Sequence, residues 1–176
     1  MKDTLISRRE FLKDIGMIGA GVLLSASPWL SAFSEVVETS GEKCRLAIIG
    51  PGSRGRFLMS FLVQNPKVEI VALCDIYQPS IEKALELAPK AKVYDDYRKI
   101  VDAVLVATPL NSHCQIVLDA FDAGKHVFCE KSIGFTMEEC FRIYSKHIST
   151  GKIFFTGQQR LFDPRYIKVM EMVHAG

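Results

Sequence analysis

A glycine-rich turn followed by an aspartate is the first pattern in this sequence that could bind a ligand. Gly50-Pro-Gly52-Ser-Arg-Gly55 fits the spacing G-x-G-x-x-G, and Asp75 ends the next apolar run. Gly50 would permit a tight turn, Gly52 a close backbone approach to a pyrophosphate, and Gly55 close packing of a helix on a strand. The pattern therefore predicts a dinucleotide-binding turn.

The charge of Asp75 favours NAD over NADP. Its carboxylate would accept hydrogen bonds from the adenine ribose hydroxyls and would repel the 2′-phosphate of NADP. Arg54 and Arg56 argue for NADP, because either guanidinium could reach a phosphate. The backbone N–H groups at the helix start, beginning with Ser53, would hold the pyrophosphate. We expect NAD as the cofactor and NADP as the second choice; a glycine-rich turn without a ligand stays open.

Other residue types that often carry chemistry lack the spacing for it. The five cysteines form no Cys-x-x-Cys pair and lie mostly in or beside apolar runs, so we expect buried, inert thiols. The four histidines are scattered, so we expect no metal site. The net charge is only +2, and no basic stripe with interleaved aromatic residues suggests a nucleic-acid partner.

Apolar runs and helical patterns alternate from residue 44 onward. We expect strands at 44–49, 68–74, 93–94, 101–107, 125–129 and 152–156. We expect helices at 55–64, 79–88, 112–123, 136–149 and from 163 to the end. This alternation predicts an α/β fold, a Rossmann-type doubly wound parallel sheet with helices on both faces.

Details within this pattern predict the ends of the helices. Thr136-Met-Glu-Glu139 has the spacing of a capping box, Asp163-Pro164 that of a helix start, and Gly124 follows a helix C-terminus. In the first helix, four apolar residues are expected on one face: Phe57, Leu58, Phe61 and Leu62.

The connection after the expected third strand is short. Only residues 95–100 separate Val93-Tyr94 from Val101, whereas a parallel crossover takes about a dozen residues or more. In the strand order 3-2-1-4-5-6 the chain must cross roughly 14 Å. A stretch of this length reaches only ~20 Å when fully extended, and it must also return along the strand. We therefore expect Val93-Tyr94 to be absent, frayed or displaced, with no ordinary helix before Val101.

Three motifs come in order at strand ends: Ile48-Ile-Gly-Pro-Gly-Ser-Arg-Gly55, Ala107-Thr108-Pro109 with His113, and Cys129-Glu130-Lys131. Together they resemble the glucose–fructose oxidoreductase/inositol dehydrogenase (Gfo/Idh/MocA) family over about residues 44–176. The resemblance implies an NAD-dependent oxidoreductase that acts on a sugar or polyol by hydride transfer. It also implies that Thr108 and Pro109 line the cofactor near its ribose, and that Glu130 lies beside the nicotinamide.

Lys131 is the candidate catalytic residue on this resemblance. It matches the family lysine that contacts the substrate hydroxyl and assists proton transfer; a solvated loop lysine is the alternative. His113 is expected near the cofactor at the start of a helix rather than as a general base. Gln158, within Gly157-Gln158-Gln159-Arg160, is expected to border the site.

Besides the short connection at residues 95–100, the sequence departs from the family in two ways. Ser132 follows Lys131 where the family usually has proline, so the loop that aims Lys131 is expected to differ. The family continues into a C-terminal substrate domain that carries most substrate contacts and the catalytic histidine. We expect that domain to be absent after Gly176, and turnover with it; a clipped or degenerate gene would explain both this and the short connection.

Residues 1–33 have the pattern of an export signal. Arg8-Arg9 precedes Phe11-Leu12 and an apolar run, Ile15 to Leu24, that is too short to span a bilayer. The pair looks like a twin-arginine signal, which would hand the folded protein to the twin-arginine export machinery. We expect a periplasmic or other extracytoplasmic location, a linker at 34–43 and the nucleotide-binding domain at 44–176. An amphipathic first helix is the alternative.

Two other functions stay open beside the sugar or polyol oxidoreductase. A glycosidase that oxidises its sugar transiently is one, because NAD-dependent α-N-acetylgalactosaminidases resemble this chain in export signal and motifs. A non-catalytic nucleotide-binding remnant is the other. The sugar, the redox direction and the oligomeric state stay open.

Overall fold

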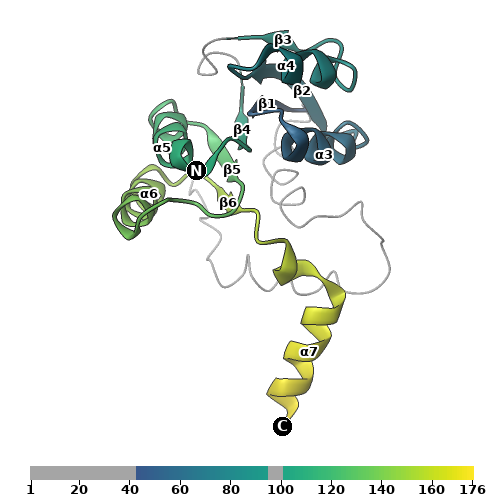
Figure 1. The fold of residues 1–176 in the computed structure, drawn as a ribbon. Coiled ribbons are helices and arrows are strands. Elements are labelled where there is room, and N and C mark those ends of the chain that lie inside the picture. The colour runs from purple at the N-terminus through teal and green to yellow at the C-terminus, as the bar shows by residue number, and fades with distance from the viewer. Residues whose placement is uncertain (1–42, 95–100) are drawn as a thin grey trace, which may run out of the picture.

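The computed structural model describes residues 43–94 and 101–176 as one parallel sheet with flanking helices (Figure 1). The predicted signal segment, and the linker apart from Lys43, lie outside these residues. Six strands form the sheet in the order β3-β2-β1-β4-β5-β6, all parallel. They are β1 (Cys44–Ile49), β2 (Val68–Cys74), β3 (Lys92–Val93), β4 (Ala103–Val106), β5 (His126–Cys129) and β6 (Phe154–Thr156). The predicted Rossmann-type fold is confirmed.

Helices cover both faces of the sheet. The α-helices are α3 (Ser53–Leu62), α4 (Gln78–Leu85), α5 (His113–Asp122), α6 (Met137–Thr150) and α7 (Pro164–Ala175), with short 3-10 turns η1 (Leu110–Ser112) and η2 (Gln159–Phe162). In Figure 1, α7 extends away from the sheet. Over the described ranges, no helix combines the length and the apolar character needed to cross a membrane.

Alternation along β1 explains why the sheet needs both helical layers. Leu46 and Ile48 lie in a core cluster with α3 and α4, whereas Ala47 and Ile49 lie in a second cluster with α5 and α6. Successive residues of a strand point to opposite faces, so a strand that is apolar throughout must be covered on both.

The predicted helix ends are confirmed. The Thr136 hydroxyl accepts from the Glu139 N–H at 3.2 Å, and the Glu139 side chain returns to the Thr136 N–H, which completes the capping box. Asp163 caps α7 by accepting from the Arg165 N–H at 3.0 Å. Gly124 follows α5 with φ of 71°.

The buried face of α3 is rotated from the predicted one. Leu58 and Leu62 are buried as expected, but Phe57 is 53% exposed and Met59 is fully buried. Phe57 instead packs edge-on against Phe61, with ring centroids 5.1 Å apart. The rotation follows from Gly55, which is buried against the preceding turn and fixes which side of α3 meets the sheet.

The prediction that the third strand is absent or displaced is wrong, although the strand is short, with two exposed residues where a frayed strand was the other expectation. Lys92 and Val93 pair in parallel register with Ala72 and Leu73 of β2, and the Tyr94 N–H donates to the Leu73 carbonyl at 3.0 Å. The prediction measured the connection from Tyr94 to Val101. The strands leave a longer connection, residues 94–102, which reaches ~30 Å when extended, enough to cross to β4. Residues 95–100, where we expected no helix, lie outside the described chain.

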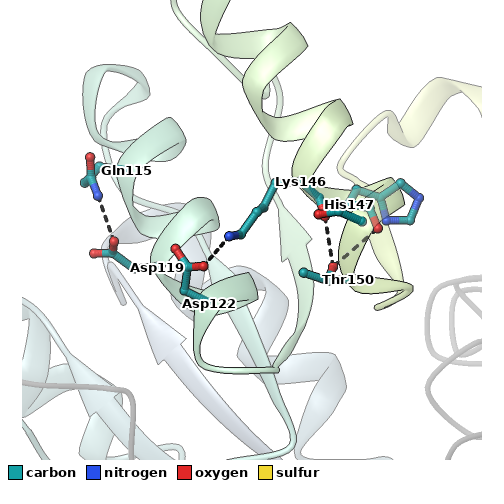
Figure 2. A network of polar contacts seen from close by, with 7 residues as sticks. Gln115, Asp119, Asp122, Lys146, His147 and Thr150 are labelled. Carbon is teal, nitrogen blue, oxygen red and sulfur yellow. Dashed lines mark hydrogen bonds and ion pairs between the residues drawn. The ribbon is translucent and has the colours of Figure 1, made fainter.

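Polar contacts tie α5 to α6 at the ends of these helices that lie away from the glycine turn. Figure 2 shows Lys146 of α6 reaching Asp122 near the end of α5, where the two form an ion pair. The Thr150 hydroxyl donates to the Lys146 carbonyl at 3.1 Å and so closes the last turn of α6. These contacts hold α5 and α6 together at their C-terminal ends, where neither helix carries a predicted site residue.

Candidate functional site

The predicted site residues gather at one edge of the sheet. Because all six strands are parallel, their carboxyl ends meet at the same edge. Gly50, Asp75 and Glu130 directly follow β1, β2 and β5, and Thr108 and Gln158 come two residues after the ends of β4 and β6. β1 lies between β2 and β4: strands β2 and β3 follow it on one side, and β4, β5 and β6 lie on the other. Such a switch point is where α/β sheets bind their ligands.

The glycine turn fits against β4 only without side chains. Gly50 has φ of +81°, and a Cβ there would lie 2.7 Å from the backbone nitrogen of Thr108. A Cβ on Gly55 would lie 2.4 Å from the Gly50 carbonyl oxygen. Both glycines therefore serve the packing of the turn itself, as the sequence predicts for Gly55.

Gly52 differs from the other two glycines of the turn. A Cβ at this position would meet no atom within 4 Å, so the fold does not require glycine here. Gly52 is the N-cap of α3, whose start has no side-chain cap and no acidic residue in its first turn. Exposed N–H groups at a helix start attract anions. A dinucleotide pyrophosphate fits this arrangement, with Ser53 and Arg54 offering N–H groups.

Asp75 is held by its own loop. Its Oδ1 accepts from the Tyr77 N–H at 2.9 Å. No hydrogen bond from a described residue reaches Oδ2, so this oxygen is available to a ligand. Ile76 and Tyr77 beside it are both exposed. A carboxylate fixed in this way could accept from a ribose hydroxyl.

The two arginines of the turn have different partners. The Arg54 Nε donates to Oε1 of Glu130 at 2.6 Å, whereas Arg56 donates to the Pro51 carbonyl at 2.8 Å within the turn. The sequence singles out both arginines as possible phosphate ligands but does not predict either partner.

Glu130 is buried between three segments. It is 5% exposed, and its Oε2 accepts from the N–H of Lys131 at 3.2 Å. A Cβ on Gly157, after β6, would lie 2.8 Å from the Glu130 carboxyl carbon. Gly157 is therefore a site residue that the sequence analysis did not predict. Its neighbour Glu130 is distant in the sequence, and no local pattern indicates that the two residues are in contact.

His113 fastens the same loop from the other side. Its ring is 2% exposed, with Nε2 lying 2.8 Å from the Thr108 carbonyl oxygen and Nδ1 lying 2.7 Å from that of Ser132. Carbonyl oxygens only accept, so a neutral ring makes one of these bonds and an imidazolium makes both. Within the described chain, His113 and Glu130 are the buried polar or charged residues, and both hold the loop around Lys131.

Thr108 and Pro109 follow β4, and Thr108 lies against Gly50 of the glycine turn. The Ser112 hydroxyl lies 2.8 Å from the Thr108 Oγ1 and 2.7 Å from the Pro109 carbonyl oxygen, which closes η1. Thr108 is half-buried and Pro109 is exposed. Their predicted contact with a cofactor stays a prediction.

Lys131 and Gln158 present exposed side chains at this edge. The peptide bond between Lys131 and Ser132 is cis. Glu130 holds the N–H of Lys131, and His113 lies against the carbonyl of Ser132, so buried groups fix the backbone on either side of Lys131. The Lys131 side chain is exposed, which contact with a substrate would require.

The thiol that precedes Glu130 is buried and held in its protonated form. Burial, reinforced by the charge of Glu130, raises the pKa of Cys129 to about 12. Burial likewise raises the pKa of Cys44 to about 11. Among residues 43–94 and 101–176, no group of three or more His, Cys, Asp or Glu side chains is arranged to hold a metal ion.

Comparison with solved structures supports this assignment of the fold. The crystal structure of myo-inositol 2-dehydrogenase from Lactobacillus plantarum superimposes with a TM-score of 0.71 at 28% identity, covering 77% of this chain and 42% of that one.

Two curated relatives match nearly the whole chain. A glycosyl hydrolase family 109 protein from Stenotrophomonas maltophilia is 30% identical over 97% of this chain. An alpha-N-acetylgalactosaminidase from Shewanella oneidensis is 28% identical over the same share. The chain spans 39% of the length of the first and 43% of the second.

Residues 44–158 match the sequence model of the family described as "Oxidoreductase family, NAD-binding Rossmann fold". The match begins at β1 and ends just after β6, so it includes the whole sheet and the glycine turn. The chain belongs to this Gfo/Idh/MocA family of oxidoreductases and contains its NAD-binding Rossmann domain.

Proposed function

We propose that this domain binds NAD as the cofactor-binding part of an oxidoreductase that acts on a sugar or polyol. The observation that carries the proposal is the uncapped start of α3 beside Gly52, where the fold leaves open space that a phosphate would fill. The inositol dehydrogenase that shares this fold supports the substrate class.

Each residue would have a defined task in this reaction. The N–H groups of Ser53 and Arg54 would bind the pyrophosphate, and Asp75 would accept from the adenine ribose hydroxyls. The bound nicotinamide would supply a hydride acceptor for the carbinol carbon. Lys131 would take the proton of the substrate hydroxyl, because its exposed side chain rises from a loop that Glu130 and His113 hold.

Calorimetric titration with NAD and with NADP tests the cofactor. We expect NAD to bind more tightly, because the Asp75 carboxylate repels a 2′-phosphate. Tighter binding of NADP, or no binding of either nucleotide, would contradict the proposal.

A glycosidase is the second candidate function. The observation that favours it is that a family 109 glycosyl hydrolase and an alpha-N-acetylgalactosaminidase each match 97% of this chain. Such an enzyme would oxidise its sugar transiently and reduce it again after the aglycone leaves. Net NADH formation with free sugars, measured on an enzyme that contains this domain, would support the dehydrogenase. Aglycone release from an N-acetylgalactosaminide without net NADH would support the glycosidase.

We also propose export through the twin-arginine route. Arg8-Arg9 and the apolar run that follows support it. A folded-protein route suits a protein that would take up NAD in the cytoplasm.

A further inference from the structure

Arg54 joins two motifs that are far apart in the sequence. It lies in the first turn of α3, and its Nε donates to the Glu130 carboxylate, 76 positions later, at the end of β5. The carboxylate is 7% exposed, whereas the arginine side chain is 38% exposed. Removing one partner of a buried ion pair leaves the other charge uncompensated. The position of Glu130 therefore depends on Arg54.

The guanidinium of Arg54 is fixed but still has donors to offer. Its Cζ lies 5.2 Å from the centroid of the Phe57 ring, which supports one face of the group. Within the described residues, only Nε of Arg54 makes a hydrogen bond. Both terminal nitrogens are therefore available at the start of α3. A guanidinium can hold a carboxylate on one edge and a phosphate on another.

Glu130 passes this constraint to Lys131. Its second oxygen accepts from the backbone N–H of Lys131 at 3.2 Å. Gly157 lies against the carboxylate on the side of β6, where even a Cβ would come within 2.8 Å of it. The carboxylate has little room to move, so its two hydrogen bonds are made together.

We propose that Arg54 is a positioning residue that connects the phosphate-binding turn to the loop carrying Lys131, with Glu130 as the connecting group. The inference rests on the proposed function, which assigns the turn to the cofactor phosphates and Lys131 to the substrate. A phosphate bound at the start of α3 would engage the terminal nitrogens of Arg54. It would thereby also fix Nε, Glu130 and the backbone at Lys131.

The backbone amide of Lys131 reports on this connection directly, because it donates to Glu130. In the full chain grown with isotope-labelled lysine, the NMR signal of this amide is identified by its loss in Lys131→Arg. We expect Arg54→Gln to move the signal by more than its line width. The amide signal of Lys168, on α7, should stay in place.

Arg56→Gln is the matched control. Arg56 lies on the same helix and carries the same charge, but it donates to the Pro51 carbonyl and has no bond to Glu130 in the described chain. It should leave the Lys131 amide signal unchanged. Glu130→Gln keeps the size of the side chain and should move the signal. In the double variant with Arg54→Gln, the signal should move no further than in the more affected single variant.

Two measurements separate this inference from the proposed function. In the ligand-free proteins, a Lys131 amide signal that is the same in Arg54→Gln as in the wild type overturns the connection, whether or not NAD binds. In calorimetry, a wild-type protein that does not bind NAD overturns the proposed function, while the ligand-free comparison still decides the connection. If both hold, Arg54→Gln should bind NAD about tenfold more weakly, the loss expected for one charge-assisted contact.

Discussion

The three glycines of the turn do different work at the scale of single residues. Gly50 and Gly55 are required by the fold, because a Cβ on either would approach backbone atoms to within 3 Å. Gly52 is not required by the fold, because its Cβ would point into open space. A sequence motif treats the three alike, but the structure separates the two glycines that packing requires from the one that it does not.

This difference gives a prediction for Gly52. Gly52→Val should abolish NAD binding, because the branched side chain would occupy the space of the pyrophosphate. The protein should stay folded, with a fall in stability of only about 1 kcal/mol from the loss of a favoured N-cap residue, since φ at Gly52 is −64° and a Cβ there would meet no atom within 4 Å. Calorimetry and thermal denaturation measure the two effects.

Gly55→Ala is the control for this prediction. Its Cβ would lie 2.4 Å from the Gly50 carbonyl oxygen, so it should destabilise the fold by about 1–3 kcal/mol through overpacking. If Gly52→Val binds NAD normally, the pyrophosphate does not lie at the start of α3.

Asp75 gives a second prediction at this scale, on the choice of cofactor. Asp75→Ala should weaken NAD binding about tenfold and raise NADP affinity relative to NAD, since it removes both the ribose acceptor and the repulsion of the 2′-phosphate. It also removes the bond from the Tyr77 N–H.

Asp75→Asn separates these effects, because its side-chain oxygen can still accept from Tyr77. Competition titrations with both nucleotides should show the rise in relative NADP affinity in both variants. An unchanged ratio would mean that Asp75 does not face the ribose.

At the scale of elements, the sequence predicts what local patterns determine. The capping box at Thr136 and the caps at Gly124 and Asp163 were all predictable, because each is specified by residues within one turn of helix. The rotation of α3 and the Arg54–Glu130 pair were not predictable from local pattern. They depend on contacts between segments that only the assembled sheet brings together.

The third strand shows how a small error in element ends leads to a wrong expectation about a whole strand, although the predicted strand order is confirmed. Counting the connection from Tyr94 to Val101 made it too short to cross to β4. With the strand ending at Val93 and β4 beginning at Ala103, the chain is long enough. A physical argument from reach is only as good as the strand limits it uses.

Strands β5 and β6 give a prediction on the pH dependence of stability. The Nδ1 of His126 accepts from the Ile153 N–H at 3.0 Å, so the folded protein holds this ring neutral. Burial, reinforced by the charge of Lys152, lowers the pKa of His126 from 6.5 to about 4. Between these values the unfolded chain binds the proton and the folded chain does not. Above pH 6.5, His126 does not lower the free energy of unfolding. As the pH drops from 6.5 towards 4, His126 lowers this free energy progressively.

His126→Asn should flatten this profile, because asparagine can accept from Ile153 but does not titrate. Urea denaturation at a series of pH values measures the slope for each protein. His174→Asn, on exposed α7, is the matched control and should keep the wild-type slope. A wild-type slope in His126→Asn would show that other groups cause the loss of stability in acid.

At the scale of the whole molecule, the site exists only in the assembled sheet. Its parts come from the ends of five strands, and the contact between Gly50 and Thr108 joins segments on either side of the switch point. The relatives extend well beyond the part that this chain matches. A cofactor bound at such a site must be bound after folding. If NAD is taken up in the cytoplasm, the protein must therefore fold there and bind NAD before it is exported.

The prediction for export follows from this order of events. Arg8→Lys with Arg9→Lys keeps the charge of the segment but replaces two planar guanidinium groups with ammonium groups, which a receptor for the arginine pair should distinguish. We expect this variant to accumulate in the cytoplasm as a folded precursor that binds NAD. Lys2→Gln is the matched control, because it changes the charge but keeps the pair, and it should be exported normally. Fractionation of cells that express each variant, followed by immunoblotting, measures the distribution. Normal export of the double-lysine variant would mean that the signal is read for its charge and apolar run alone, and the protein would then cross the membrane unfolded and without cofactor.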